Sequence, residues 1–477
     1  SDPMSVRPPR PDLPPKPQAR KDSVSLWQYL ALFRRDILSA QPMRLYGAWM
    51  AEFRTPFFRS YLLNQPELIK RVLKTQPVAF PKSDRIGAGL RPLLGNSVFL
   101  TNGAEWQRQR RIIDPAFQSV GIRQAFPAMW AAGLQAVARL RPHIGQKSPV
   151  EIEFETSHLA ADVIFRTLFS LPITNQIATQ MFEQFKIYQR SQPLLNAAAF
   201  FGFPRWFPRF FRGDTRRSAR SIRRLITKLT KERMDQIKAG TAPDDLATKI
   251  MTQRDPETDD RFSIEEMVDQ VAIFFLAGHE TSASALAWAL YLLATHPDWQ
   301  EQVAKEAAIL TAPDYASVAK LKLSRDVFRE TLRLYPPVPM MVRQSTCPVT
   351  FRNREIAPGS QMVVSPWHLH RHTRLWDNPD GFDPARWHTE NGKACQRDAY
   401  IPFSTGPRVC IGAGFAMVEG PLLLSMLVKN FRFEALPRHR PTPVAHLTVR
   451  SKSGIWLNIH PRSGECGVTP PVTEGEF

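Results

Sequence analysis

One stretch, SIEEMVDQVAIFFLAGHETSASALAWALYLLATHPDW, limits the possible folds of this chain more than any other. Ser263 and Glu266 have the spacing of an N-terminal capping box and Pro297 marks the end, so the sequence predicts one helix of about 50 Å at about 1.5 Å per residue. Its apolar centre is long enough for a transmembrane helix, but the polar residues 279–281 lie in the middle, where polar groups are costly and usually functional. We therefore expect a long helix buried in a core and interrupted by a polar site. A plain core helix with satisfied polar groups is the alternative.

The rest of the chain is typical of a mainly α protein with small β-sheets, an α+β fold class. Helical patterns dominate residues 102–336, and short extended runs with a Pro-Gly turn signal follow. No internal repeat or linker divides the chain, so we expect one domain over residues 23–462. The proline-rich residues 1–22, which begin with the tag scar Ser1–Pro3, are expected to be flexible, and residues 463–477 are expected to form a loose tail.

The charge balance favours an acidic partner. Lys and Arg number 63 against 44 Asp and Glu, a formal net charge of +19. No dense basic block with interleaved aromatic residues occurs, which argues against nucleic acid. The first residues form no signal peptide and residues 23–33 are too short to span a bilayer, so no transmembrane anchor is expected. Four cysteines without a C-x-x-C pair fit a reducing, cytoplasmic compartment, and we expect a monomer.

The stretch FSTGPRVCIGAGFA surrounds a single cysteine, Cys410, with small residues. Gly406 and Gly412 allow close backbone approach, and a helix that begins just after Cys410 would stabilise its thiolate. A nucleophilic thiolate would need a neighbouring base, and the stretch holds no histidine. Because haem can be held by one protein ligand, a thiolate on haem iron is the better interpretation. For the cysteine taken alone, a small buried hydrophobe is the alternative.

This stretch is similar to the cysteine-ligand loop of the cytochrome P-450 superfamily, F-x-x-G-x-R-x-C-x-G, at every fixed position. The resemblance extends over residues 23–460 and is to the soluble bacterial type. It implies the cytochrome P-450 fold, with haem b (iron protoporphyrin IX) between a long central helix and the cysteine-ligand loop. It also implies that Cys410 is the iron ligand, that Phe403 shields its sulfur, and that Gly412 belongs to the cofactor site.

Other landmarks of the family follow in the expected order. ETLR supplies Glu330 and Arg333, one helical turn apart, and FDPARW supplies Arg386. An E-x-x-R pair by itself is usually a solvated surface ion pair. Together with the loop around Cys410, however, the resemblance implies a buried Glu-Arg-Arg cluster that fixes the ligand loop.

AGHET, residues 277–281, resembles the family's A-G-x-[DE]-T oxygen-activation motif. The small pair Ala277 and Gly278 would leave room for dioxygen over the haem, and the Thr281 hydroxyl would hold water or bound oxygen. Glu280 can relay protons from solvent, so Glu280 and Thr281 are the candidate catalytic residues.

WQRQR places Trp106 and Arg110 four residues apart on one helix face, where an indole N–H and a guanidinium suit haem propionates. By resemblance, Arg343 and Arg408 occupy two further propionate-binding positions. For Trp106 alone, core packing is the default interpretation, and the ordered set of motifs favours the functional one.

The resemblance implies a haem-dependent monooxygenase that inserts one oxygen atom from O2 into a hydrophobic or amphipathic small molecule, by hydroxylation, epoxidation or dealkylation. The alternatives are a haem-thiolate peroxygenase or isomerase, and a non-enzymatic haem gas sensor; the intact AGHET motif argues for oxygen activation. By family position the substrate pocket draws on largely apolar and aromatic segments. One stretch, FFGFPRWFPRFF at residues 200–211, is either a lip that touches membrane or packing between two helices.

Electrons are expected from another protein, since the sequence contains no flavin or iron–sulfur motif and no reductase domain follows Cys410. The resemblance implies an acidic ferredoxin or flavodoxin with its NAD(P)H reductase. Arg108 and Arg111 share the helix of Trp106 but point off its propionate-facing stripe. We expect these two arginines to form a basic docking face; the alternative is that they only solubilise the surface.

Overall fold

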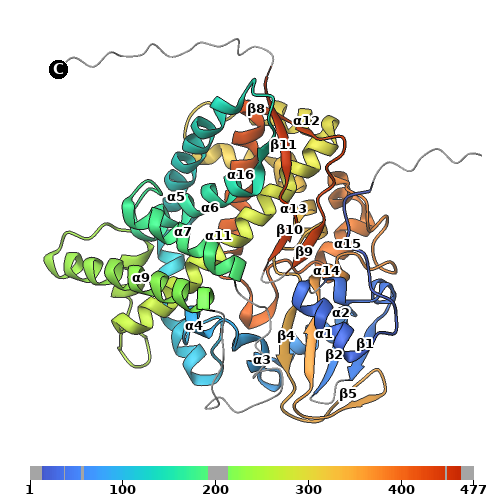
Figure 1. Cartoon of the computed structure of the whole chain (residues 1–477). Helices are drawn as coiled ribbons and strands as arrows, with labels where there is room; N and C mark the ends of the chain where they lie inside the picture. Colours follow the sequence, from blue (N-terminus) through green and yellow to red (C-terminus); the bar gives the residue numbers. More distant parts are fainter. Residues whose placement is uncertain (1–12, 37, 55–57, 192–212, 446–447, 463–477) are drawn as a thin grey trace, which may run out of the picture.

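A computed structural model describes residues 13–36, 38–54, 58–191, 213–445 and 448–462 (Figure 1). Helices dominate this part of the chain and small sheets complete it, so the predicted class, mainly α with small β-sheets, is confirmed. The helices are α1 (Leu26–Arg35), α2 (Pro66–Lys70), α3 (Asp84–Gly87), α4 (Arg91–Leu94), α5 (Gly103–Leu140), α6 (Ile152–Phe169), α7 (Gln176–Ser191), α9 (Gly213–Ala239), α10 (Leu246–Thr252), α11 (Ile264–Thr295), α12 (Pro297–Ala307), α13 (Lys322–Leu334), α14 (Pro366–Leu369), α15 (Glu390–Asp398) and α16 (Ala413–Asn430). The strands are β1 (Met50–Arg54), β2 (Arg59–Leu63), β3 (Val150–Glu151), β4 (Met341–Gln344), β5 (Val349–Phe351), β6 (Arg354–Ile356), β7 (Gln361–Val364), β8 (Phe431–Ala435), β9 (Pro443–Ala445), β10 (Val449–Ser451) and β11 (Trp456–Pro461).

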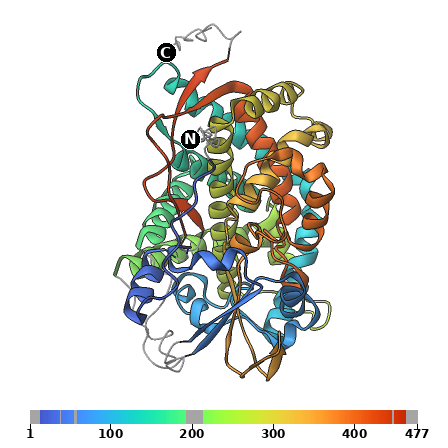
Figure 2. The same cartoon turned by 90° about the vertical axis from the view of Figure 1, so that its right-hand side faces the viewer.

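Helix α11 passes through the middle of the molecule in both views (Figures 1 and 2). It begins with the predicted capping box: the Ser263 hydroxyl accepts from the backbone N–H of Glu266 at 3.1 Å, and the Glu266 carboxylate accepts from the backbone N–H of Ser263 at 3.2 Å. It ends at Thr295, just before the His296–Pro297 pair that cannot continue it. The long buried helix predicted from the sequence is therefore present.

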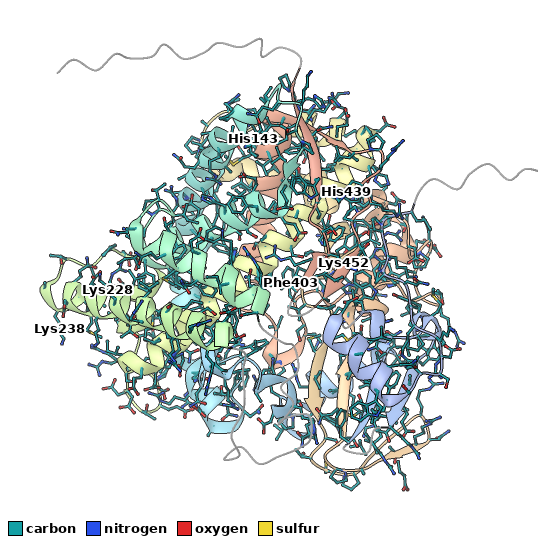
Figure 3. All side chains as sticks on the ribbon, in the orientation of Figure 1. His143, Lys228, Lys238, Phe403, His439 and Lys452 are labelled. Carbon is teal, nitrogen blue, oxygen red and sulfur yellow. The ribbon has the colours of Figure 1, made fainter. Side chains whose placement is uncertain are left out.

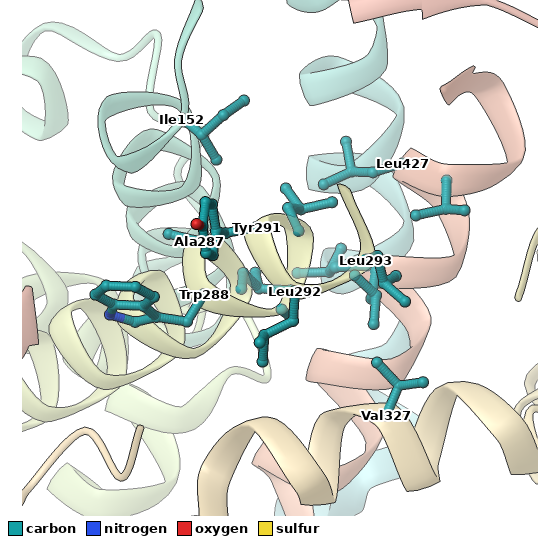
Figure 4. Close-up of a cluster of buried hydrophobic side chains, with 14 of the residues drawn as sticks. Ile152, Ala287, Trp288, Tyr291, Leu292, Leu293, Val327 and Leu427 are labelled. Carbon is teal, nitrogen blue, oxygen red and sulfur yellow. The ribbon is translucent and has the colours of Figure 1, made fainter. Parts of the chain in front are cut away.

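A cluster of buried apolar side chains surrounds the second half of α11 (Figure 4). The Trp288 ring stacks on the Tyr335 ring with centroids 4.1 Å apart and an interplanar angle of 15°. Such aromatic pairs contribute about 0.5–1.5 kcal/mol beyond the area that they bury. Other helices and strands contribute the rest of the cluster, including Ile152 of α6, Val327 of α13 and Leu427 of α16.

The largest sheet lies to one side of the helical body, at the lower right of Figure 1, whereas β8 and β11 lie among the helices. The largest has the strand order β1-β2-β7-β4, with β2 and β7 parallel and the other pairs antiparallel. Its edge strand β4 carries Arg343, whose backbone forms an isolated antiparallel β-bridge with that of Lys82. The remaining sheets have the orders β3-β11-β8, β10-β9 and β5-β6.

Helix α5 is broken at Gly121, whose φ of 65° and ψ of 161° are not helical. This positive φ suits glycine. Trp106 and Arg110 lie on the first half, before the break.

Residues 13–22, which the sequence assigns to a flexible extension, lie against the body of the protein. The Tyr335 hydroxyl donates to the carbonyl of Pro15 at 2.7 Å, and Lys16 pairs with Asp380 at 3.3 Å. Of the proposed extension, residues 1–12 lie outside the described residues, as do the tail 463–477 and the stretch 200–211. A search of the described helices finds none with the length and apolar character needed to cross a bilayer.

Gly420 of α16 packs directly against Phe328 of α13. A Cβ atom at Gly420 would overlap the ring of Phe328. We predict that Gly420→Ala destabilises the protein by about 1–3 kcal/mol, because the buried Phe328 ring has to move. The measurement is the thermal midpoint of the haem-bound protein. Gly213→Ala on α9, where Arg217 is the one described residue with an atom as near as 4.0 Å, is the control and should leave the midpoint unchanged or higher. Equal midpoints for wild type and Gly420→Ala would contradict the prediction.

Candidate functional site

The segment before Cys410 forms a tight loop that folds back on itself. The backbone N–H of Cys410 donates to the carbonyl of Phe403 at 2.9 Å, which closes the loop. Ser404 and Gly406 both have positive φ, 65° and 78°. A Cβ at Gly406 would overlap the carbonyl of Leu73, so only glycine lets the loop pack on the turn Arg71–Thr75 (η3). The loop geometry therefore depends on Gly406 more than on any other of its residues.

The Cys410 thiol is accessible, although surrounding protein still raises its pKa by burial. The backbone N–H of Gly412 and the charge of Arg110 act in the opposite direction and favour the thiolate. Phe403 packs against a small apolar cluster that includes Ala285 of α11 and Phe328 of α13. Figure 3 shows Phe403 near the centre of the view. An accessible thiol enclosed by protein can serve as a ligand to a bound iron.

The AGHET turn lies in the middle of α11. Ala277 is exposed and Gly278 and Thr281 are half-buried, while the preceding residues 271–276 are buried. The Thr281 hydroxyl donates to the carbonyl of Ala277. One residue later, the hydroxyl of Ser282 donates to Glu419 at 3.4 Å, which places this turn against α16, the helix that follows the Cys410 loop. The AGHET turn thus contacts the helix that begins three residues after the accessible cysteine.

Gly278 has a packing role that the sequence does not reveal. A Cβ there would stand 2.9 Å from the side chain of Ile164 on α6. The missing side chain therefore lets α6 approach α11, whereas the sequence assigned Gly278 to the space for dioxygen. Ala277, with its exposed methyl group, is the residue of the pair that borders open space.

Glu280 and His279 are buried on the other sides of α11. The Glu280 carboxylate accepts from the Thr448 hydroxyl at 3.1 Å and from Arg450 at 3.3 Å. His279 lies edge-on to the rings of Phe182 and Phe185, and burial lowers the pKa of His279 to about 3, so the ring is neutral. Arg450 was not among the residues singled out from the sequence.

The three residues Glu330, Arg333 and Arg386 form one buried cluster. Arg333 Nε donates to one carboxylate oxygen of Glu330 at 2.5 Å, and Arg386 Nε donates to the other at 2.7 Å. Their remaining N–H groups donate to backbone carbonyls of the segment 370–381. The cluster therefore holds this irregular segment as well as the two arginines.

His370 links the cluster to the Cys410 loop. Its Nδ1 bonds the carbonyl of Arg333 at 3.2 Å, and its Nε2 accepts from the backbone N–H of Ile401 at 2.9 Å. Because Nε2 accepts, the ring is the neutral Nδ1–H tautomer, and burial lowers the pKa of His370 to about 3. His368 makes a local contact with the Ser365 hydroxyl, whereas His370 joins two parts of the candidate site.

The candidate propionate-binding residues lie together beside the loop. Arg408 stacks over the Trp106 ring at 4.6 Å, and Arg110 lies 5.6 Å from the same ring. Arg408 also donates to Asn102 at 2.9 Å, and Arg110 pairs with Asp114 at 2.9 Å.

Arg343 and Lys82 complete this cationic group. Arg343 is buried and donates only to its own neighbour, the carbonyl of Val342, at 3.4 Å among the described residues. Lys82 was missed in the sequence because it carries no motif; the bridge between Lys82 and Arg343 brings it here.

Among the described residues no carboxylate pairs with Lys82, Arg343 or Arg408. Burial lowers the pKa of Arg343 to about 10. The pKa of Arg408 is lowered to about 9 by burial and by the nearby charges of Arg343 and Arg110. The pKa of Lys82 is held well below its usual range by burial and by the positive charges of Arg343 and Arg408. A partly buried group of cations without counter-charges requires an anion. The two carboxylates of haem fit this group, and the Cys410 thiol fits the iron.

The comparisons with known proteins agree with this arrangement. The family model described as Cytochrome P450 matches residues 46–458. The chain belongs to the cytochrome P450 family. Cyclooctatin synthase of Streptomyces melanosporofaciens is 31% identical over 402 residues, which are 81% of this chain and 84% of that protein. Cytokinin hydroxylase of Arabidopsis thaliana is 28% identical over 407 residues, 84% of this chain and 78% of that protein.

The fold of the solved heme domain of cytochrome P450DA is also similar. Its TM-score is 0.74 at 24% identity, with 87% of this chain and 90% of that chain covered. The expected cytochrome P450 fold is therefore confirmed. Membership of the family makes the protein a haem-dependent monooxygenase, and haem supplies the oxygen and one-electron chemistry when it is bound.

The structure does not support Arg108 and Arg111 as a docking face for the redox partner of this cytochrome P450. Arg108 pairs with Glu266 at the start of α11, and Arg111 makes two bonds to Asp255, at 2.8 and 2.9 Å. Hydrogen bonding from Arg111 holds the pKa of Asp255 well below its usual range. Both arginines are neutralised within the chain, because the surface of α5 that seems free in the sequence packs on the segment 254–266.

We predict that Lys82→Met weakens haem retention in this cytochrome P450. A hydrogen bond to a charged group contributes about 1.5–3 kcal/mol, so transfer of haem to excess apomyoglobin should be about tenfold faster or more. The readout is the rate of haem transfer followed by absorbance, which does not depend on activity. Lys238→Met on α9, exposed at the outer edge of the molecule (Figure 3), is the control. Identical transfer rates would show that Lys82 does not contact haem.

Proposed function

We propose that Cys410 is the iron ligand of the haem and that Trp106, Arg110, Arg343 and Arg408, with Lys82, bind its propionates. The accessible thiol of Cys410, next to a group of cations without counter-charges, carries this proposal. Further residues complete the proposed site. Phe403 shields the sulfur and Gly412 favours the thiolate, while Ala277 and Gly278 shape the space for dioxygen. Glu280 and Thr281 deliver protons, and the ligand loop is held by Glu330, Arg333 and Arg386.

The proposed substrate is a hydrophobic or amphipathic small molecule that receives one oxygen atom from O2. Two observations support this class. The relatives are named as cyclooctatin synthase and cytokinin hydroxylase, names that denote small organic molecules. In this chain, the residues on α11 before Ala277 are Val271, Ala272, Ile273, Phe274, Phe275 and Leu276, all apolar. A library of terpenoids, steroids, fatty acids and aromatics screened for spectral shifts of the ferric haem would identify the substrate. No shift with any of the four classes would contradict the proposal.

The ligand assignment is tested at Cys410. We predict that Cys410→His moves the absorption band of the ferrous carbon monoxide complex to the position of imidazole-ligated haem, because imidazole would replace thiolate as the protein ligand of the iron. Cys410→Ser should lose the thiolate band as well. Cys395→Ser, at a buried cysteine whose thiol donates to the Leu375 carbonyl, is the matched control and should keep the band. A normal band in Cys410→Ser would exclude Cys410 as the ligand.

Thr281 tests proton delivery. We predict that Thr281→Ala binds haem and substrate normally but yields several-fold less product per electron, because the hydroxyl that positions a proton donor is lost. The missing electrons should leave as hydrogen peroxide, which is measured together with product. Thr295→Ala at the far end of α11 is the control; among the described residues its hydroxyl bonds two carbonyls of its own helix and the neighbouring His296. Unchanged product yield in Thr281→Ala would remove this residue from the mechanism.

The proposed electron donor is an acidic ferredoxin or flavodoxin served by an NAD(P)H reductase in the cytoplasm, and the enzyme is a monomer. With Arg108 and Arg111 neutralised, we place the docking face at the exposed Lys70 and Lys74. Lys74 follows Leu73, whose carbonyl packs on Gly406 of the ligand loop. Neither lysine has an ion-pair partner in the part of the chain that the structure describes.

We predict that Lys74→Glu slows reduction of the haem by the acidic donor, because the substitution reverses an attractive charge near the ligand loop. The rate at limiting donor should also fall as salt is raised in the wild type and depend less on salt in the variant. Stopped-flow reduction measures both. Lys228→Glu, on the outer face of α9, has the same charge change far from the loop and should reduce at the wild-type rate (Figure 3). Equal slowing in both variants would show that only net charge matters.

A further inference from the structure

Two carboxylates from different helices share one guanidinium. Arg450 of β10 donates to Glu280 of α11 at 3.3 Å and pairs with Glu153 of α6 at 3.5 Å. The other oxygen of Glu153 accepts from the backbone N–H of Ser451 at 3.0 Å. The Glu280 side chain is 6% exposed, that of Glu153 12% and that of Arg450 20%, so the group runs from the interior toward solvent.

Arg450 is placed by α11 itself. The carbonyl of Val449, the residue before it, accepts from the Ser284 hydroxyl at 2.5 Å and from the Trp288 indole at 3.3 Å. Both donors are buried on the helix that carries Glu280. The strand bearing Arg450 is therefore fixed relative to Glu280, which a flexible surface arginine would not be.

Two hydroxyl groups also contact the group formed by Glu153, Arg450 and Glu280. Ser157, four residues after Glu153 on the same face of α6, accepts from Arg450 at 3.2 Å, and Thr448 donates to Glu280 at 3.1 Å. A guanidinium does not lose its proton in proteins, so Arg450 holds the carboxylates but cannot pass protons between them. The hydroxyls of Ser157 and Thr448 can pass protons.

The outer carboxylate has the acidity that proton exchange with water requires. Burial raises the pKa of Glu153 to about 7, against the opposing effect of Arg450. The other charged group that faces Glu153 is Glu151 of β3, which also acts to raise the pKa. At neutral pH Glu153 is therefore present in both protonation states.

The inner end of the group contains polar atoms without partners among the described residues. The second oxygen of Glu280, Oε2, has no hydrogen-bond partner in the described part of the chain, and neither has the hydroxyl of Tyr188 on α7. Burial and the nearby Glu280 raise the pKa of Tyr188, so this hydroxyl keeps its proton. A buried carboxylate oxygen without a donor is costly, and protonation or a water molecule would relieve that cost.

We propose that Glu153 supplies protons to Glu280 and that Arg450 is the positioning residue that holds both carboxylates on one path. A proton leaves the Glu153 carboxyl inward along Ser157, Thr448 and water to Glu280, and Glu153 regains a proton from solvent; no other bond changes. This proposal rests on the proposed role of Glu280 and Thr281 in oxygen activation, and it adds the route by which protons reach them.

The first test compares Glu153→Gln with Glu155→Gln. Glu155 lies on the same helix and pairs with Arg139 at 3.8 Å, away from Arg450, so it offers the same change of charge outside the path. Glu153→Gln should bind haem and substrate normally, yield about tenfold less product per electron at pH 7, and show a larger solvent isotope effect on product formation. Glu155→Gln should behave as the wild type. Equal yields and isotope effects in the wild type and Glu153→Gln would overturn the proposal.

The second test needs no turnover. The folded-state pKa of Glu153 is raised, so the folded protein holds this proton more tightly than the unfolded chain does. Its contribution to stability is present at acid pH and is lost as pH rises toward and through about 7. The thermal midpoint of Glu153→Gln, relative to that of the wild type at the same pH, should therefore rise as the pH is raised from 5 to 8. At pH 6 the infrared spectrum of the variant should also lack the protonated-carboxyl contribution of Glu153, whereas that of Glu419, whose pKa burial raises to about 8, should remain. A midpoint difference that is independent of pH would overturn the assignment of Glu153 as the proton-exchanging group.

Two further variants keep the proposal testable if Glu153→Gln does not fold. Ser157→Ala breaks the path without a change of charge and should lower product per electron with a larger isotope effect. Arg450→Lys should retain most of the wild-type yield, whereas Arg450→Met should not. Normal yields in both Ser157→Ala and Arg450→Met would overturn the proposal.

The failure of this proposal is distinguishable from failure of the proposed function. If Thr281→Ala loses product but Glu153→Gln, Ser157→Ala and Arg450→Met do not, protons reach the motif by another route. If Thr281→Ala itself is fully productive, the proposed role of the motif fails, and the pH dependence of stability still decides whether Glu153 titrates near neutral pH.

Discussion

The Glu330 carboxylate, buried and shared between two arginines, is the interaction on which the site depends. Removal of one partner from a buried charge group typically costs about 3–5 kcal/mol, because the remaining charge is left without compensation. Here the arginines also hold the backbone carbonyls of the segment 370–381, and His370 connects that segment to Ile401 at the start of the ligand loop. The position of Cys410 thus follows from a charge cluster that never touches it.

A second electrostatic constraint lies on the other side of the loop and has the opposite character. Lys82, Arg343 and Arg408 are brought together by the edge of a sheet and by the loop, without a carboxylate among the described residues to neutralise them. The Glu-Arg-Arg cluster is complete within the chain, whereas this group is complete only with an anionic ligand. Without haem, the folded protein therefore carries an unfavourable arrangement of positive charges. Because a dicarboxylate cofactor would neutralise these charges only in the folded state, haem binding should stabilise the fold.

The sequence was informative where a local pattern determines the structure. The capping box at Ser263 and the stop at Pro297 define α11, and the spacing around Cys410 is specific enough to identify the family. Residues that act through tertiary contacts could not be found in this way. Lys82 and Arg450 carry no motif, and the site residues beside them, Arg343 and Glu280 respectively, are more than a hundred residues away in the chain. Arg108 and Arg111 were misjudged for the same reason: helical periodicity shows which face of α5 they occupy, but not which segment covers that face.

The two supply routes proposed for this enzyme use separate parts of the fold. The docking face at Lys70 and Lys74 belongs to α2 and η3, while the proton path runs between α6 and β10 toward α11 (Figure 1). Because Glu153 lies on other elements than the docking lysines, a bound electron donor would leave the proton path open to water. Salt, which screens exposed charges, should therefore alter electron delivery more than proton delivery. The contacts of Arg450 with Glu153 and Glu280, which are largely shielded from solvent, are much less sensitive to ionic strength.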